Sequence, residues 1–383
     1  MNLAPAIVDF SKELTLIRRD IHAHPEIGFE ENRTSQIVAN HLQAWGAEVH
    51  RSIGGTGVVG VINGKGPGRR IGLRADMDAL PMAEATGFSH ASKTPGVFHG
   101  CGHDGHTTML LGAARHLAST RNFAGQIVLI FQPAEEGLGG ARRMIADGLF
   151  DRFPCDEIYG LHNWPGAPLG RISLTRGVAM AAADTFDIHI SGRGAHGAQP
   201  HHAVDPIMVA TAIAQALQTI VSRNVDAVKS AIVSITQIHA GSAYNVIPET
   251  AFLGGTIRTF EPAVRDLIAQ RITSLARSIA EGFGAEATVA IEPRFSALRN
   301  DDRLAESAMQ VAAEIVGPTL AEYDELPKTG SEDFAEMLAI VPGAYLLLGQ
   351  GEGPALHNPR YDFNDAAIPI GATLLARLAE ARA

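Results

Sequence analysis

The sequence contains few residues that could cross-link it or anchor it in a membrane. It has two cysteines, Cys101 and Cys155, in 383 residues. Two thiols exclude a disulfide framework and fit a reducing cytoplasm. No run approaches the roughly 18 apolar residues that suggest a membrane span. The first ten residues include Asp9 and no basic segment followed by an apolar stretch. We therefore expect a cytoplasmic protein without a signal peptide, an anchor or a membrane partner.

Clusters of positive charge are also missing. The chain has 31 Lys and Arg against 41 Asp and Glu, which gives a formal net charge of -10 at pH 7. Nucleic-acid binders need clustered positive charge to displace counterions, so nucleic acid is not expected as a partner. What is present is the composition of a folded protein, with 46% hydrophobic and 19% charged residues. At 383 residues the chain exceeds the size at which single cores usually stop growing, which predicts two domains.

Strand and helix patterns alternate in the first part of the chain. Short apolar runs predict strands at 57–62, 70–74, 126–132 and 157–161, and helical periodicity predicts helices at 4–22, 34–45 and 106–118. This alternation indicates an α/β domain with a mostly parallel sheet and helices on both faces. A β-α-β-β-α-β order follows, which is the ferredoxin-like arrangement. We predict a catalytic, metal-binding domain at 1–184 and 293–383, with an α+β domain inserted at 185–292.

The most informative segment is His99-Gly100-Cys101-Gly102-His103-Asp104-Gly105-His106, just ahead of a predicted helix. A Cys and a His two residues apart on a glycine-rich turn can aim a thiolate and an imidazole at one point, which suits a transition metal. The segment also fits a helix start that happens to be rich in histidine. Its spacing equally permits a thiol nucleophile, Cys101, activated by His103.

Further residues of ligand type lie at the ends of predicted strands. In an open α/β sheet, ligands collect at the carboxyl ends of strands. Neighbouring side chains diverge, so one Glu of a pair can bind metal while the other faces the substrate and carries protons. Each such residue alone is more often structural, but the set predicts a shared site. Its members are the Glu135-Glu136 pair, His162 and His357.

Two carboxylates, Asp76 and Asp78, follow the strand at 70–74. They fit either hydrogen-bond acceptors that orient ligating imidazoles or caps of the next turn. The residues by themselves leave three functions open: a metal-dependent hydrolase, a thiol amidase that uses Cys101, and a binding protein with a structural metal. Glu135 favours the hydrolase, because a structural site has no use for a carboxylate that does not bind the metal.

From His22-Ala23-His24-Pro25-Glu26 to Leu356-His357-Asn358-Pro359, the sequence resembles the amidohydrolase branch of the M20 metallopeptidases. That branch includes hippurate hydrolases, N-acyl-amino-acid deacylases and indoleacetyl-amino-acid hydrolases. The resemblance implies hydrolysis of small N-acyl-L-amino acids to a carboxylic acid and an amino acid, with Glu135 as the general base for a metal-activated water. It implies one or two divalent ions (Mn, Zn, Ni or Co) held by Cys101, His103, Glu136, His162 and His357. The aminopeptidase-like branches carry His-x-Asp where Asp76-Met77-Asp78 stands, so the roles of both Asp residues stay open.

The inserted region resembles the lid and dimerisation domain of the same family, which implies a homo-oligomer, either a dimer or an assembly of dimers. His196 matches a residue that assists the oxyanion, often in the active site of the partner subunit. Asn245 and Arg258 match positions expected to hold the substrate carboxylate. Considered without the resemblance, His196 fits a loop histidine in solvent and Arg258 fits a salt bridge at a strand end.

Overall fold

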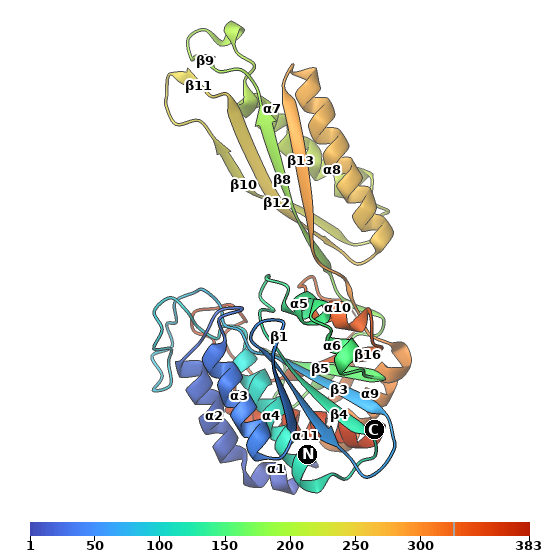
Figure 1. The fold of residues 1–383 in the computed structure, drawn as a ribbon. Helices are drawn as coiled ribbons and strands as arrows, with labels where there is room; N and C mark the ends of the chain where they lie inside the picture. The colour runs from blue at the N-terminus through green and yellow to red at the C-terminus, as the bar shows by residue number, and fades with distance from the viewer. Residues whose placement is uncertain (325) are drawn as a thin grey trace. The chain divides into compact units, whose positions relative to one another are not determined.

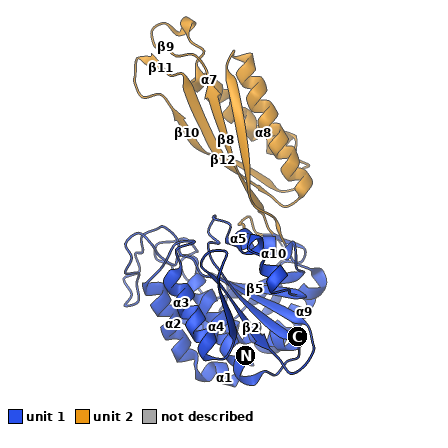
Figure 2. Cartoon of the chain, viewed as in Figure 1, with its two compact units in different colours: residues 1–179, 299–327, 333–383 blue, residues 180–298, 328–332 orange. Residues whose placement is uncertain are grey.

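The computed structural model describes residues 1–324 and 326–383, and it consists of two compact units (Figures 1 and 2). Unit 1 comprises Met1–Ala179, Arg299–Pro327 and Asp333–Ala383, and unit 2 comprises Met180–Leu298 and Lys328–Glu332. The insertion predicted at 185–292 lies inside the limits of unit 2. Unit 2 also includes a short return of the chain, because the amide of Ala181 donates to the carbonyls of Lys328 and Gly330 at 3.1 and 3.0 Å.

Unit 1 is built on an eight-stranded sheet with the order β1-β2-β4-β3-β5-β16-β6-β15. The four central strands, β4, β3, β5 and β16, are parallel to one another. The pairs β1–β2, β2–β4 and β16–β6 are antiparallel, and β15 is parallel to β6. This arrangement confirms the predicted, largely parallel α/β sheet. The strands are β1 (Glu48–Ile53), β2 (Gly57–Asn63), β3 (Arg70–Asp76), β4 (Gln126–Gln132), β5 (Glu157–Trp164), β6 (Ile172–Leu174), β15 (Ala321–Tyr323) and β16 (Gly343–Gly349).

Helices surround this sheet in Figure 1. Ile127, Leu129 and Phe131 of β4 belong to one large core with residues of α2, α3, α4, α9 and α11, whereas α5 packs against α10. The single helix predicted at 4–22 is wrong, because the chain leaves helical geometry at Phe10 (φ −101°, ψ 11°) and forms two helices. The helices of unit 1 are α1 (Pro5–Asp9), α2 (Ser11–Ala23), α3 (Asn32–Ala44), α4 (His103–Thr120), α5 (Gly140–Ala146), α6 (Leu149–Arg152), α9 (Asp302–Val316), α10 (Phe334–Leu338), the 3-10 turn η2 (Asp365–Ala367) and α11 (Ile368–Arg382).

Unit 2 has a four-stranded antiparallel sheet with the order β10-β12-β8-β13. Along β8, Phe186, Ile188 and Ile190 join the core formed with the helices α7 and α8, while the alternate residues Asp187 and His189 are exposed. The chain order β8-α7-β10-β12-α8-β13 confirms the predicted ferredoxin-like arrangement. The elements are β8 (Ala182–Ser191), β9 (Ala195–His196), η1 (Pro200–His202), α7 (Pro206–Arg223), β10 (Ala231–Ala240), β11 (Val246–Ile247), β12 (Thr250–Thr259), α8 (Pro262–Gly282) and β13 (Glu286–Phe295).

Two short strands, β7 (Val178–Met180) and β14 (Leu298–Arg299), pair where the chain passes between the units. Among the helices of the described residues, none combines the length and the apolar character that crossing a membrane requires.

Candidate metal centre

Cys101 and His103 are positioned by the turn that begins α4. Gly102 is the N-cap of this helix, and its φ of 93° lies in the left-handed region that favours glycine. A Cβ at this position would also collide with the side chains of Asn163 and Tyr361. Glycine therefore allows the turn that buries the thiol of Cys101 and the imidazole of His103 in unit 1.

The structure brings together the five residues that the sequence analysis predicts as ligands. Sγ of Cys101 lies 3.5 Å from Nε2 of His162 at the end of β5. Oε1 of Glu136, after β4, lies 4.0 Å from Nε2 of His103 and 3.3 Å from Nε2 of His357. Cys101 belongs to two groups of candidate ligand atoms, one with His103 and His162 and the other with Glu136 and His357, and the atoms of each group lie within 4.8 Å of one another.

The donor atoms of this cluster fit a transition-metal ion. Nε2 of His103 and Oε1 of Glu136 are buried, and neither makes a hydrogen bond with a described residue. A buried polar atom without a hydrogen bond is costly, and the contacts of these two atoms within the protein are ion-pair contacts, of Glu136 with His357 at 3.3 Å and with His103 at 4.0 Å. A set of Cys, His and Glu donors is typical of sites for zinc and related ions.

The charges around the cluster favour a cation at its centre. Burial lowers the pKa of His103, but the negative charge of Asp76 and contacts with Cys101 and Asp78 outweigh burial and hold that pKa well above its usual value. Contacts with Cys101 and Glu136 raise the pKa of His357 to about 10. Without a metal, the imidazoles of His103 and His357 therefore favour the protonated, positively charged form, because anionic groups surround them. A divalent ion would neutralise the same groups, and its binding would release these protons.

His162 has the protonation state that a metal ligand requires. Burial, with a smaller contribution from the neighbouring His106, keeps its pKa well below the usual value, so the ring is neutral. Nδ1 of His162 lies 2.7 Å from the carbonyl of Asn163, which can only accept a hydrogen bond. Nδ1 therefore carries the proton, and Nε2 directs its lone pair towards Cys101.

Asp76 and Asp78 have different contacts. Oδ1 of Asp78 lies 3.1 Å from Nδ1 of His103, and its Oδ2 accepts the amide hydrogen of Glu136 at 2.9 Å. Asp78 thus orients two predicted ligands, as carboxylates beside metal-binding histidines commonly do. Asp76 makes its short contacts with Nη1 of Arg74 at 2.7 Å and Nδ1 of His106 at 2.6 Å, and it lies 3.9 Å from Nε2 of His103.

Glu135 is buried beside the cluster, with an oxygen within 4.8 Å of ligand atoms of His103 and Glu136. Backbone hydrogen bonds hold the residues on both sides of Glu135, and on one side the amide of Glu136 donates to Asp78 at 2.9 Å. Ala134 has a left-handed φ of 55°, and its amide donates to the buried Glu31 at 2.8 Å. Backbone strain of this kind persists where surrounding contacts impose it, and it is commonly found at functional sites.

Several residues around the cluster received no role from the sequence. Oδ1 of Asn163 lies 2.6 Å from Nε2 of His106, and Nδ2 of Asn163 donates to the hydroxyl of Tyr361 at 2.7 Å. Asp333 accepts from Arg74 at 3.1 Å and from Gln132 at 2.7 Å. The sequence hinted at a role for Asn163 and Arg74 only through their positions, because Asn163 directly follows His162 and Arg74 lies two residues before Asp76. Neither position reveals the hydrogen bonds to Tyr361 and Asp333.

In unit 2, His196 and Asn245 are neighbours, and both are exposed. His196 pairs with Val246 between β9 and β11, and the carbonyl of Asn245 accepts the amide hydrogen of Gly197 at 2.8 Å. Arg258 lies near the opposite end of β12, where it pairs with Ala183 of β8. The end of β12 that begins at Thr250 is the one next to β11 in the chain, and β11 pairs with His196. From Thr250 to Arg258 the strand extends roughly 26 Å, at about 3.3 Å per residue. One copy of unit 2 therefore does not bring Arg258 together with His196.

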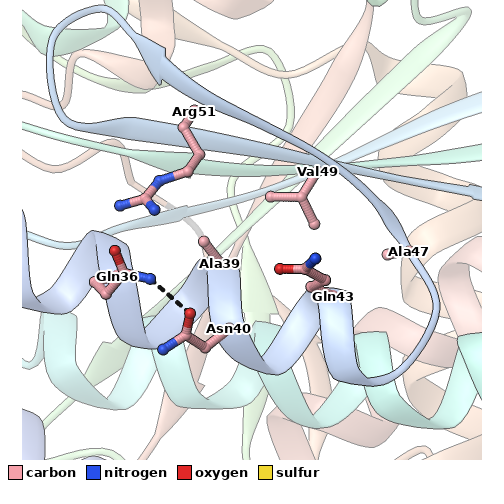
Figure 3. Close-up of a pocket in the computed structure, with 7 residues that line it drawn as sticks. All are labelled: Gln36, Ala39, Asn40, Gln43, Ala47, Val49 and Arg51. Atoms are coloured by element: carbon pink, nitrogen blue, oxygen red, sulfur yellow. Dashed lines mark hydrogen bonds between the residues drawn. The ribbon is translucent and has the colours of Figure 1, made fainter.

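A separate pocket of about 240 Å³ lies between α3 and β1 (Figure 3). Within it, Nε2 of Gln36 donates to Oδ1 of Asn40 at 2.6 Å. The pocket contains none of the predicted site residues, and we assign it no role. Its lining consists of Gln36, Ala39, Asn40, Gln43, Ala47, Val49 and Arg51.

Comparison with known proteins gives consistent matches along the chain. A sequence profile of "Peptidase family M20/M25/M40" matches residues 72–381. The hippurate hydrolase of Campylobacter jejuni is 43% identical over 379 residues, which cover 99% of each chain. An N-acetyl-L-cysteine deacetylase of Bacillus subtilis is 40% identical over 93% of this chain and 85% of its own length.

Solved structures give the same result. A putative aminohydrolase from methicillin-resistant Staphylococcus aureus is 31% identical, with a TM-score of 0.91 over 98% of both chains. The YXEP protein of Bacillus subtilis, described as a dinuclear metal-binding peptidase from the M20 family, is 33% identical, with a TM-score of 0.85 over 98% of both chains.

Proposed function

The chain belongs to peptidase family M20/M25/M40 and is a metal-dependent amidohydrolase, and from this premise we propose that it hydrolyses the amide bond of small N-acyl-L-amino acids. The main support from the structure is the cluster in unit 1. Two buried ligand atoms, Nε2 of His103 and Oε1 of Glu136, make no hydrogen bond with a described residue, and Glu135 lies beside them. The similarity to a hippurate hydrolase and an N-acetylcysteine deacetylase supports the substrate class, because both act on N-acylated amino acids.

In the proposed mechanism, Cys101, His103, Glu136, His162 and His357 hold one or two divalent ions. When bound, such an ion lowers the pKa of a coordinated water from about 15.7 towards 7 and polarises a carbonyl oxygen. Glu135 accepts the proton of the attacking water and later delivers it to the departing amine nitrogen.

Side chains of unit 2 complete the proposed site. His196 donates a hydrogen bond to the oxyanion of the tetrahedral intermediate, and donors of this kind are worth about 3 to 4 kcal/mol in comparable enzymes. Asn245 and Arg258 bind the carboxylate of the substrate. Burial lowers the pKa of Arg258 from its usual high value, and Asp184 partly opposes this shift, so the guanidinium remains charged at neutral pH.

A panel of N-acyl amino acids tests the substrate class. We expect purified protein supplied with Mn, Zn, Co or Ni to release glycine from N-benzoylglycine, or a free amino acid from N-acetyl substrates. We expect no turnover of peptides with an unblocked amino terminus. The released amino acid is the quantity to measure. If the metal-loaded protein hydrolyses the peptides and none of the acylated substrates, the proposed substrate class is wrong.

We also infer that the active enzyme contains at least two copies of the chain. Arg258 and His196 lie farther apart in one unit 2 than a small substrate extends, so we assign them to different copies around each bound substrate. The end of unit 2 that carries His196 also exposes large apolar side chains, which is a feature of protein interaction surfaces. These side chains are Ile207, Met208, Ile238, Tyr244 and Val246.

Mixing two inactive variants tests this sharing directly. His196→Ala and Glu135→Gln would each be inactive alone, but a mixed dimer would contain one site with an intact Glu135 and the partner's intact His196. Co-expression should recover up to about one quarter of wild-type activity, because random pairing makes half of the dimers mixed and one of their two sites is whole. If His196 acts within its own chain, the mixture will be as inactive as its components.

A further inference from the structure

Arg18 of α2 is completely buried and faces three carboxylates of unit 1. Its Nε lies 2.8 Å from Oδ2 of Asp104, and its Nη1 lies 3.4 Å from Oδ1 of Asp365. Its Nη2 donates a short hydrogen bond to Oδ1 of Asp362. A guanidinium can contact several carboxylates at once because its donors form a planar, rigid fork, and a lysine cannot reproduce this geometry.

The three carboxylates belong to two segments that carry predicted metal ligands. Asp104 directly follows His103 in the first turn of α4, which packs along α2 (Figure 1). Asp362 and Asp365 follow His357 in the chain, after β16. Arg18 therefore joins the segment of His103 to the segment of His357.

His357 needs support from outside its own segment. Its side chain is 54% exposed, whereas that of His103 is 1% exposed. Its backbone adopts a left-handed φ of 61°, a conformation that a histidine keeps only where its surroundings impose it. The amide of His357 donates to the carbonyl of Gly100 at 2.8 Å, and its Nε2 lies 3.3 Å from Oε1 of Glu136. The residues that follow it make further contacts, including that of Asp362 with Arg18.

We propose that Arg18 is a positioning residue of the metal centre, which sets the separation of His357 from His103 through Asp362 and Asp104. This inference rests on the proposed function, because it presupposes that the two histidines bind the same metal centre. Each carboxylate also has another basic neighbour: His22 contacts Asp104 at 2.8 Å, His90 contacts Asp362 at 3.2 Å and Arg19 contacts Asp365 at 2.8 Å. One connection can therefore be removed without leaving a buried charge wholly unpaired.

Asp362→Asn tests the inference, because it breaks the connection to the His357 segment and leaves Arg18 paired with Asp104. We expect the affinity for Co²⁺, measured by competition with a chromophoric chelator, to fall about tenfold to a hundredfold, the range seen for residues that orient metal ligands. The melting temperature of the metal-free protein should stay close to that of the wild type. The charge-transfer absorption between Cys101 and Co²⁺ should persist at saturating metal, since the thiol does not depend on this contact.

Arg18→Lys is a second variant that keeps the charge and removes the fork, and we expect the same loss of affinity. Arg19→Gln is the matched control, because it removes an exposed arginine that contacts Asp365, in the segment that follows His357. This variant should bind Co²⁺ like the wild type. Wild-type protein that binds no Co²⁺ would overturn the proposed function itself. Wild-type binding with unchanged affinity in Asp362→Asn and Arg18→Lys would overturn the positioning role alone. If neither variant folds, or the affinity falls only in step with metal-free stability, Arg18 is structural and the inference is wrong.

Discussion

Glu135→Gln should abolish hydrolysis while the protein keeps its metal. The amide is close in size to the carboxylate but cannot accept the proton of the attacking water. Loss of a general base costs about 10² to 10⁴ in rate, so kcat should fall by at least a hundredfold. Metal analysis of the same sample should give the wild-type content, because the predicted ligands do not include Glu135. The measurement is kcat for an N-acyl amino acid together with the metal content of the protein.

The neighbouring Glu136→Gln is the matched control for this variant. Its carboxylate lies 3.3 Å from Nε2 of His357 and 4.0 Å from Nε2 of His103, so its loss should lower metal affinity as well as activity. The contrast separates a proton carrier from a ligand although the two residues are adjacent. Near-native turnover by Glu135→Gln would remove Glu135 from the mechanism. Loss of metal by Glu135→Gln would make it a ligand instead.

Complete removal of metal should reduce activity to background, and adding Mn, Zn, Co or Ni should restore it. The expected effect is large, because the reaction then loses both the activated water and the polarised carbonyl. The protein should be treated with a chelator until metal analysis shows none bound, and then assayed before and after each ion is added. Circular dichroism before and after chelation checks that the loss does not reflect unfolding.

The same experiment decides between the metal mechanism and a thiol amidase that uses Cys101. Burial, followed by the charge of Glu136, raises the pKa of Cys101, which disfavours the thiolate that a nucleophile needs. Its sulfur also lies 3.5 Å from His162, inside the cluster of candidate ligands. Full activity in protein that has been shown to be metal-free would favour the thiol mechanism and contradict the proposed one.

The predicted fold is confirmed where local patterns carry the signal. Apolar strands alternating with helices indicate the parallel sheet of unit 1, and the alternation along β8 indicates a sheet with one covered face in unit 2. The helix α11 was not predicted, because most of its residues are buried and it lacks the polar face of an amphipathic helix. The strands β6 and β15 have three residues each, too few for a pattern.

The sequence predicted the members of the candidate site better than the contacts that position them. Ligand-type residues follow strands whose carboxyl ends meet at one edge of the sheet, and these residues do lie together, although their role as ligands stays a prediction. The sequence left open whether Asp78 contacts a ligating imidazole or caps a turn, and it did not reveal that Arg18 contacts Asp104. Such contacts depend on how distant segments pack, and one sequence contains no record of that packing.

Diffraction from crystals grown with Zn²⁺, recorded at the zinc absorption edge, would show whether the five predicted ligands hold a metal ion. We expect an anomalous peak about 2.3 Å from Sγ of Cys101 and about 2.0 to 2.1 Å from an imidazole nitrogen of His103 or His162, with Glu136 and His357 at the same centre. A zinc peak elsewhere in the protein, with the cluster of Cys101, Glu136 and His357 empty of metal, would contradict this expectation.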